Sequence, residues 1–279
     1  MKWLFVLALA AVIFGSAAFF GYRIFIAPEL AMRAERKAAS SSLPTPDISL
    51  PEFQAAAKLK ADGKLTEARV ALTAFIQKYP SGPHVGEAED LLGEINTDIL
   101  ISTYPSPEKE EYIVKSGDVL ARIAAKLKST PELIMRTNNL NGTMLHIGDK
   151  LLVSHPDFSL LIQRKAQLVY LLDHSLFFKR YHIRSVKLPS KQPAKISTHV
   201  AEVMAWKNNK RIGFGTTDYV NSTRWVRIAA PNYILYAEPD DAHRVLDVAP
   251  PPAGLALSAG DLEELSSLVN SKTPVTVTD

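Results

Sequence analysis

The sequence predicts an α+β protein of several domains: an N-terminal transmembrane helix, an α-helical hairpin unit, a βααβ module and a β-rich C-terminal domain. Three observations support this prediction. An apolar run opens the chain, apolar residues at helical spacing occupy residues 51–102, and short strand patterns separated by turn residues follow residue 108. A length of 279 residues is enough for about two domains, or more if they are small.

Residues 1–27 predict a signal anchor that crosses a membrane once. The apolar run at residues 3–22 has the length of about 20 residues that a helix needs to span a bilayer. A cleaved signal peptide is the alternative, with the small residues 15–17 as its cleavage site. Four basic residues follow the run: Arg23, Arg33, Arg36 and Lys37. By the positive-inside rule they favour a cytoplasmic location for the rest of the chain.

Residues 28–50 predict a linker, because serine and proline interrupt any regular pattern there. Residues 51–102 predict helices. The first begins at Pro51 and ends at Asp62-Gly63, the second has Thr66 as its N-cap, and the third covers about residues 85–101.

Part of this helical segment, residues 56–80, resembles one tetratricopeptide repeat. The likeness rests on Gly63-Lys64-Leu65 and on Ala68, whose small side chain lets two helices approach closely. The resemblance implies a possible protein partner at the helical unit, although at least three repeats are the norm for a free-standing array. A plain helical hairpin is the alternative.

The next segment alternates between strand and helix signals over short distances. Residues 112–114 predict a strand, and Gly117-Asp118 predicts a turn with Asp118 as the N-cap of a helix. Thr130-Pro131 predicts a second helix, with threonine as N-cap and proline in the first helical position. A closing strand at residues 150–153 completes a βααβ order.

Residues 108–154 resemble a LysM module over its whole length. The residues that carry the likeness are Tyr112, Val114, Gly117, Asp118, Leu120, Ile123, Ala124, Leu133, Asn138, Leu140, Ile147, Gly148 and Asp149. The LysM family binds glycans built of N-acetylglucosamine, so the resemblance implies the glycan strands of peptidoglycan as partner. Because peptidoglycan lies outside the cytoplasm, it also implies a bacterial inner-membrane protein with the bulk of the chain in the periplasm or facing the wall, against the positive-inside rule.

In the LysM family the ligand lies in a shallow groove between the loop after the first strand and the loop before the second. The resemblance places the glycan-binding residues here at Gly117, Asp118, Val119, Leu120, Asn141, Gly142, Thr143, Met144 and Leu145. Backbone amides and a small apolar notch in such loops suit an acetamido group. A purely structural role is the alternative for Leu120 and for Asn138, whose side-chain amide can tie a turn.

Residues 156–279 predict a β-rich domain with one clear helix. Strands are expected at residues 159–162, 167–172, 176–183, 195–206, 224–228, 234–236 and 273–277, and the helix at 261–269. Leu262, Leu265 and Val269 form the apolar face of this helix, and Glu263-Glu264 is expected on its solvent face. Trp225 is expected in the core.

This order resembles the L,D-transpeptidase catalytic domain, an enzyme that cross-links peptidoglycan stems. The likeness is strongest over residues 254–277. The family carries Ser-His-Gly-Cys-x-Arg before this tail, whereas the matching positions here hold Pro251, Pro252, Ala253, Gly254, Leu255 and Ala256. Because a thioester-forming enzyme needs a thiolate, the resemblance implies a domain without catalytic residues.

Composition narrows the classes of function further. The chain contains no cysteine, which excludes disulfides and thiolate nucleophiles. Its seven histidines show no HxH or HxxxH spacing, so no metal site and no cofactor are predicted. A net charge of +3 gives no reason to expect a nucleic-acid partner.

The expected function is therefore that of a membrane-anchored envelope protein that binds peptidoglycan and is not an enzyme. An active L,D-transpeptidase or hydrolase with an unrecognised site is one alternative. An interaction scaffold that uses the helical unit is the other.

Overall fold

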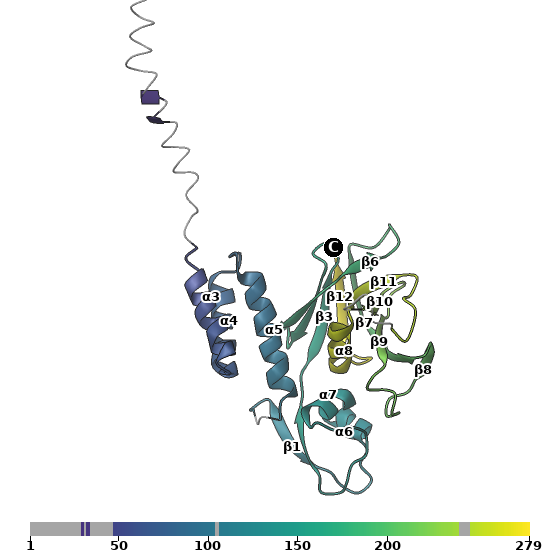
Figure 1. Cartoon of the computed structure of the whole chain (residues 1–279). Coiled ribbons are helices and arrows are strands. Elements are labelled where there is room, and N and C mark those ends of the chain that lie inside the picture. Colours follow the sequence, from purple (N-terminus) through teal and green to yellow (C-terminus); the bar gives the residue numbers. More distant parts are fainter. Residues whose placement is uncertain (1–28, 31, 34–46, 104–105, 240–245) are drawn as a thin grey trace, which may run out of the picture. The chain divides into compact units, whose positions relative to one another are not determined.

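The computed structural model describes residues 29–30, 32–33, 47–103, 106–239 and 246–279 (Figure 1). The predicted signal anchor at residues 1–27 and most of the predicted linker lie outside the described residues. None of the described helices has both the length and the apolar character needed to cross a membrane. The chain divides into two units, Met1–Ile48 and Ser49–Asp279, and every element named below belongs to the second.

Three helices come first in the described part of this unit: α3 (Leu50–Ala61), α4 (Leu65–Lys78) and α5 (Val85–Ile101). Each packs against the next, and buried Phe53, Leu72 and Ile95 fill the core between them. The unit is therefore larger than a hairpin. Ala68 is fully buried, as close helix packing requires.

The predicted N-cap of the second helix is wrong. Lys64 occupies the cap position of α4, and Thr66 already lies in the first turn. The cause is the preceding turn, in which Gly63 has a φ of +75° and its carbonyl accepts a hydrogen bond from Leu65 N. Because this turn reverses the chain within two residues, the helix begins at Leu65.

The next four elements have the predicted βααβ order: β1 (Lys109–Ile113), α6 (Leu120–Lys126), α7 (Pro131–Thr137) and β2 (Lys150–Ser154). The two strands pair antiparallel. Their core contains Leu120, Ile123, Ile134 and Leu151. Thr130 caps α7 as predicted, because its hydroxyl accepts a hydrogen bond from Leu133 N at 3.0 Å.

Within the described residues, the C-terminal part of the chain forms a ten-stranded sheet with one helix, α8 (Ala259–Leu268). The strands are β3 (Phe158–Gln163), β4 (Leu168–Asp173), β5 (Leu176–His182), β6 (Ser185–Lys187), β7 (Lys195–Lys207), β8 (Lys210–Ile212), β9 (Thr223–Ile228), β10 (Ile234–Glu238), β11 (Gly254–Ser258) and β12 (Pro274–Thr278). Their order is β5-β4-β3-β12-β7-β9-β10-β11-β6, and β8 pairs with β7. The β3–β12 and β10–β11 pairs are parallel and the others are antiparallel.

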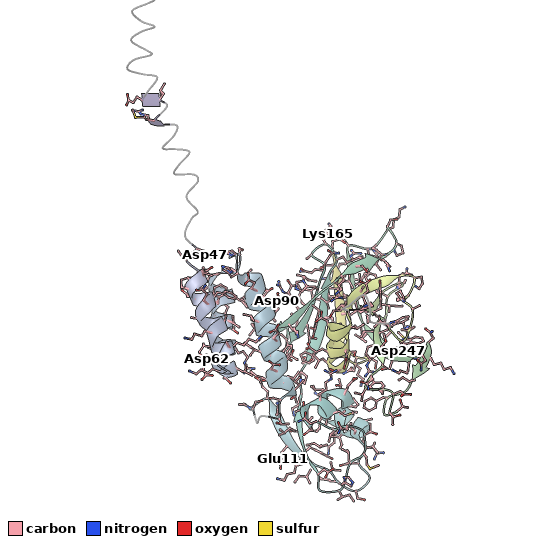
Figure 2. All side chains as sticks on the ribbon, viewed as in Figure 1. Asp47, Asp62, Asp90, Glu111, Lys165 and Asp247 are labelled. Carbon is pink, nitrogen blue, oxygen red and sulfur yellow. The ribbon has the colours of Figure 1, made fainter. Side chains whose placement is uncertain are left out.

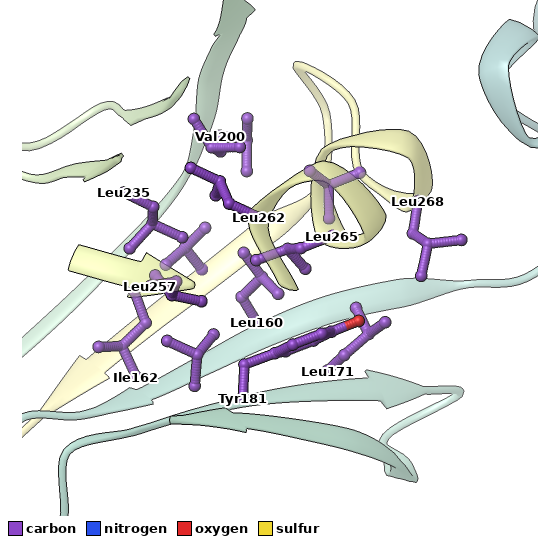
Figure 3. Packing of buried hydrophobic residues seen from close by; sticks show 14 of the residues in the cluster. Leu160, Ile162, Leu171, Tyr181, Val200, Leu235, Leu257, Leu262, Leu265 and Leu268 are labelled. Carbon is purple, nitrogen blue, oxygen red and sulfur yellow. The ribbon is translucent and has the colours of Figure 1, made fainter. Parts of the chain in front are cut away.

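Helix α8 packs on the sheet through the predicted apolar face (Figure 3). Leu262 and Leu265 are fully buried, together with Leu160 and Leu257 of the strands. Side chains alternate along a strand, so the neighbouring positions face the other way. Trp225 lies there in a second cluster with Met204, Tyr236 and Ala256, which confirms its core role.

Strand β5 carries the contacts that join the helical unit to the sheet. Arg180 donates hydrogen bonds to Asp90 at 2.7 and 2.9 Å and to Glu89 at 2.9 Å, and Asp90 projects from α5 toward the strands (Figure 2). Its guanidinium also reaches the carbonyl of Gly86 at 2.7 Å. Burial raises the pKa of Glu89, whereas at Asp90 the hydrogen bond and charge of Arg180 outweigh burial and leave the pKa lowered.

The expectation that Glu263 and Glu264 form a solvent face of α8 is wrong for Glu264, whose side chain is 21% exposed, whereas the Glu263 side chain is 43% exposed. Glu264 forms an ion pair with Lys179 at 2.7 Å and accepts a hydrogen bond from the Tyr181 hydroxyl at 2.8 Å. Glu263 pairs with Arg136 of α7 at 3.0 Å. Both carboxylates therefore face neighbouring elements, a result of tertiary packing that helical spacing alone does not reveal.

We expect Arg180→Met to lower the free energy of unfolding by about 2–3 kcal/mol. The substitution leaves two partly buried carboxylates without their shared cation, and the value lies below the roughly 3–5 kcal/mol of a fully buried pair because Asp90 is 43% exposed. Urea denaturation followed by circular dichroism measures the loss.

Arg211→Met is the matched control. Arg211 also binds a carboxylate, that of Glu202, but its side chain is 50% exposed, so the expected loss is under about 1 kcal/mol. Equal losses for the two variants would contradict the importance of the Arg180 contact.

Candidate glycan-binding site

The nine predicted glycan-binding residues lie on two loops and the first turn of α6. One loop joins β1 to α6 and the other joins α7 to β2. The two are linked by backbone hydrogen bonds of 2.9 Å from Val114 N to Asp149 O and from Gly148 N to Val114 O. Leu145 packs against the core that contains Leu120, so the inner parts of both loops rest on the same apolar cluster.

Asp118 fixes the first loop and does not cap α6, which corrects the sequence prediction. Val119 occupies the cap position. The Asp118 carboxylate accepts hydrogen bonds from Lys115 N and from the Tyr112 hydroxyl, both at 2.8 Å. These two bonds hold the pKa of Asp118 below its ordinary value, and the bond to Asp118 raises the pKa of Tyr112.

The exposed part of these loops combines apolar side chains with open backbone. Val119 is 51% exposed and Met144 is 81% exposed, so both apolar side chains are open to contact from solvent. A Cβ built on Gly117 or Gly142 would meet no atom within 4 Å, so the backbone is accessible at both glycines. Such a surface can offer amide hydrogen bonds and apolar contact together.

The side chains of Leu120, one of the nine predicted residues, and of Asn138, which is not among the nine, have structural roles. The Leu120 side chain is 1% exposed and belongs to the core, so only its backbone can meet a ligand in this conformation. Asn138 donates to Ile134 O and Leu152 O and accepts from Leu152 N, each at 2.8 Å. Its amide ties the second loop to β2, which confirms the structural role considered for it.

A loop of the C-terminal region that was not predicted to belong to the site lies beside the second glycan loop. We call residues 213–222 the flanking loop. A Cβ built on Gly215 would lie 3.4 Å from Thr143 Cγ2, so the Gly215 backbone lies against the Thr143 side chain. Residues 213–222 carry no sequence motif that indicates this contact.

Glu132 of α7 anchors the flanking loop to the βααβ module. It forms an ion pair of 2.9 Å with Arg224 and accepts a hydrogen bond of 3.1 Å from the Tyr219 hydroxyl. The Arg224 guanidinium also lies 3.6 Å from the Tyr219 ring centroid. Burial, and then the charge of Glu132, raise the pKa of Tyr219 well above its ordinary value.

The positions matched to the transpeptidase nucleophile motif lie at the start of β11. Gly254 has a φ of +151°, and a Cβ built there would lie 2.4 Å from Ile234 O. Leu255 and Ala256 are fully buried in the sheet. Among the described residues, no group of three or more His, Asp or Glu side chains is arranged to hold a metal ion.

Asp118 is expected to make the βααβ module less stable in acid. Because its pKa is lower in the folded than in the unfolded chain, its stabilising contribution is complete above the ordinary value of about 3.9 and is lost as the pH falls through the folded value. The unfolding midpoint of Asp118→Asn should lie below that of the unmodified chain at neutral pH, and this gap should close below about pH 4. Calorimetry at neutral pH and below about pH 4 measures the unfolding midpoints of both proteins. A difference between the midpoints that does not depend on pH would contradict the stabilising role of the Asp118 carboxylate.

The family model of the LysM domain matches residues 112–154. No curated protein matches the chain. Solved structures that match include an L,D-transpeptidase from Mycobacterium smegmatis, with 10% identity over 48% of this chain and 65% of that chain and a TM-score of 0.31. An L,D-transpeptidase mutant from Enterococcus faecium has 14% identity over 43% of this chain and 49% of that chain, with a TM-score of 0.30.

A fused Zn-dependent amidase/peptidase/peptidoglycan-binding protein from Clostridium acetobutylicum also matches, with 10% identity over 43% of this chain, 51% of that chain and a TM-score of 0.30. These alignments span about half to two thirds of the matched chains. TM-scores near 0.3 do not establish a common fold. The family match, together with the βααβ order, identifies residues 112–154 as a LysM domain.

Proposed function

We propose that this protein binds the N-acetylglucosamine-containing glycan strands of peptidoglycan through its LysM domain. The family match at residues 112–154 carries the proposal, since glycan binding is the activity of that family. The exposed Val119 and Met144 side chains beside open backbone support it, because an acetamido group needs both apolar contact and amide hydrogen bonds.

The proposed site uses the two LysM loops in different ways. Gly117 and Gly142 leave the backbone amides accessible, while Val119 and Met144 contact the acetamido methyl group and the sugar face. Asp118 holds the first loop in place through Tyr112 and contributes mainly by positioning. One shallow site desolvates little surface, so we propose weak binding to a single site.

We also propose that residues 1–27 anchor the protein in the bacterial inner membrane, with the LysM domain on the periplasmic side. The apolar run at residues 3–22 and the location of the proposed ligand support this orientation. The protein should fractionate with the inner membrane and keep an N-terminus at or near Met1. A soluble periplasmic form that begins near Ala18 would contradict the anchor.

The remaining part of the proposal is that the protein is not an enzyme. The L,D-transpeptidase resemblance would require a thiolate, and the chain contains no cysteine. Gly254, the matched position, has no room for a side chain beside Ile234 O. Any role of the C-terminal region then consists of binding and positioning.

The variant Val119→Glu/Met144→Glu should reduce sedimentation of the full chain with purified sacculi. Both substitutions place a charge where the proposed apolar contact forms, and each lost contact on this scale weakens binding by about tenfold. Pelleting across a range of sacculus concentrations measures the change, with circular dichroism as the check on folding.

Ile113→Glu/Ile147→Glu is the matched control for the same assay. Ile113 is 49% exposed and Ile147 is 74% exposed, and both lie in the LysM domain outside the proposed contact surface. Sedimentation should stay close to that of the unmodified chain. If the two double variants lose binding equally, the groove has been placed on the wrong surface.

Incubation with a carbapenem, which acylates transpeptidase thiolates, should leave the intact mass of the full chain unchanged. Gly254→Cys should not restore acylation, and its free energy of unfolding should fall by about 2–4 kcal/mol because of steric overlap and unfavourable φ. An adduct on the unmodified chain would overturn the non-enzyme proposal.

A further inference from the structure

The flanking loop gives the candidate glycan site a second side. The first contact between the two loops is at Gly215 and Thr143, where a Cβ on the glycine would lie 3.4 Å from the threonine methyl group. Gly215 has a φ of +89°, a conformation that favours glycine. Thr143 is one of the predicted glycan-binding residues, so the flanking loop begins at the edge of the proposed groove.

A cavity of about 360 Å³ opens further along the same two loops. On the LysM side Asn139, Leu140 and Asn141 line it together with Glu132, Met135 and Arg136 of α7. On the other side Tyr219 and Val220 of the flanking loop line it together with Ile101 of α5 and Glu263 of α8. Asn141 therefore belongs both to the predicted glycan site and to this cavity. The volume lies within the range of roughly 300–1,000 Å³ found for small-molecule pockets.

Contacts with Glu132 and Arg224 hold the wall that the flanking loop contributes, and Glu132 itself lines the cavity. Tyr219 is bonded to Glu132 through its hydroxyl and lies under the Arg224 guanidinium. Arg224 is itself buried and paired with Glu132. Val220, the next residue, nevertheless remains 50% exposed and faces the cavity. A fixed backbone that presents an exposed apolar side chain is suited to contact with a ligand.

We propose that this cavity is a second carbohydrate subsite, which takes a further N-acetylated sugar of the strand bound at the LysM loops. The inference rests on the proposed glycan-binding function and adds the flanking loop to the site. Leu140 and Val220 match the apolar face of a pyranose ring and its acetamido methyl group. Asn139 and Asn141 supply amide donors and acceptors for the ring hydroxyls and the acetamido group.

The test compares soluble N-acetylglucosamine oligomers of increasing length by isothermal titration calorimetry with the full chain. Val220→Glu should bind the longest oligomer about tenfold more weakly than the unmodified chain, a difference of about 1.4 kcal/mol. Its affinity for the shortest oligomer that binds should be unchanged, because that oligomer fills only the LysM groove. Val220→Ala, which adds no charge, should weaken binding of the long oligomer by a smaller factor.

Thr217→Glu is the matched control, since it places the same charge on an exposed residue of the flanking loop that does not line the cavity. It should bind every oligomer like the unmodified chain. Unfolding midpoints of all variants check that the loop stays folded.

The outcomes separate this inference from the function on which it rests. If Val220→Glu binds long oligomers as tightly as the unmodified chain, or loses all lengths equally, the second subsite is overturned while the LysM site stands. If the unmodified chain binds neither oligomers nor sacculi, both proposals are overturned.

Discussion

The rest of the structure depends on how the edge strand β5 is covered. β5 is the last strand of the sheet order, so one side of its backbone lacks a strand partner within the sheet. Helix α5 packs along it, and Asn96 of this helix donates a hydrogen bond of 2.7 Å to Phe178 O. A Cβ on Gly93 would lie 2.7 Å from Lys179 Cγ, which shows how closely the helix approaches. An uncovered edge would be a template for aggregation, so the helical unit has a structural role.

Ion pairs form where α5 and α7 contact the C-terminal sheet and its flanking loop. They determine the geometry of these contacts more than they add to stability. Desolvation offsets much of the attraction within a buried ion pair, so Glu132–Arg224 is weak support for net stability. Removing either partner would leave a buried charge, and this penalty fixes the position of α7 against the flanking loop. The apolar contribution comes from Leu133 and Leu100, which join the core of the sheet from α7 and α5. Burial of apolar side chains thus drives the packing of α5 and α7 against the sheet, and the ion pairs select the orientation of this packing.

Local signals predicted the parts of the fold that local interactions determine. The βααβ order and the Thr130 cap both follow from short-range patterns. The strands β6, β8 and β11 were not predicted. The first two have three residues each, and β11 follows a proline-rich segment that suggests a loop.

The candidate site likewise has parts that the sequence predicted and parts that depend on tertiary packing. Its two loops could be located from the LysM resemblance, whereas the burial of Leu120 follows from how the helices pack. The flanking loop is about 70 residues away along the chain, and its approach to Thr143 depends on the whole sheet and on Glu132. Tertiary contacts of this kind leave no periodic pattern in a single sequence.

The sheet geometry around Gly254 also bears on the function of the C-terminal region. The parallel pairing of β10 and β11 brings Ile234 O to within 2.4 Å of where a side chain at residue 254 would begin. A nucleophile at this position would require the two strands to separate, and Leu235 and Leu255, both fully buried, resist that movement. Closed packing at this point is compatible with a rigid support that holds the flanking loop beside the LysM domain. A site composed of two rigid walls would lose little conformational entropy when a glycan binds, which supports the proposed second subsite.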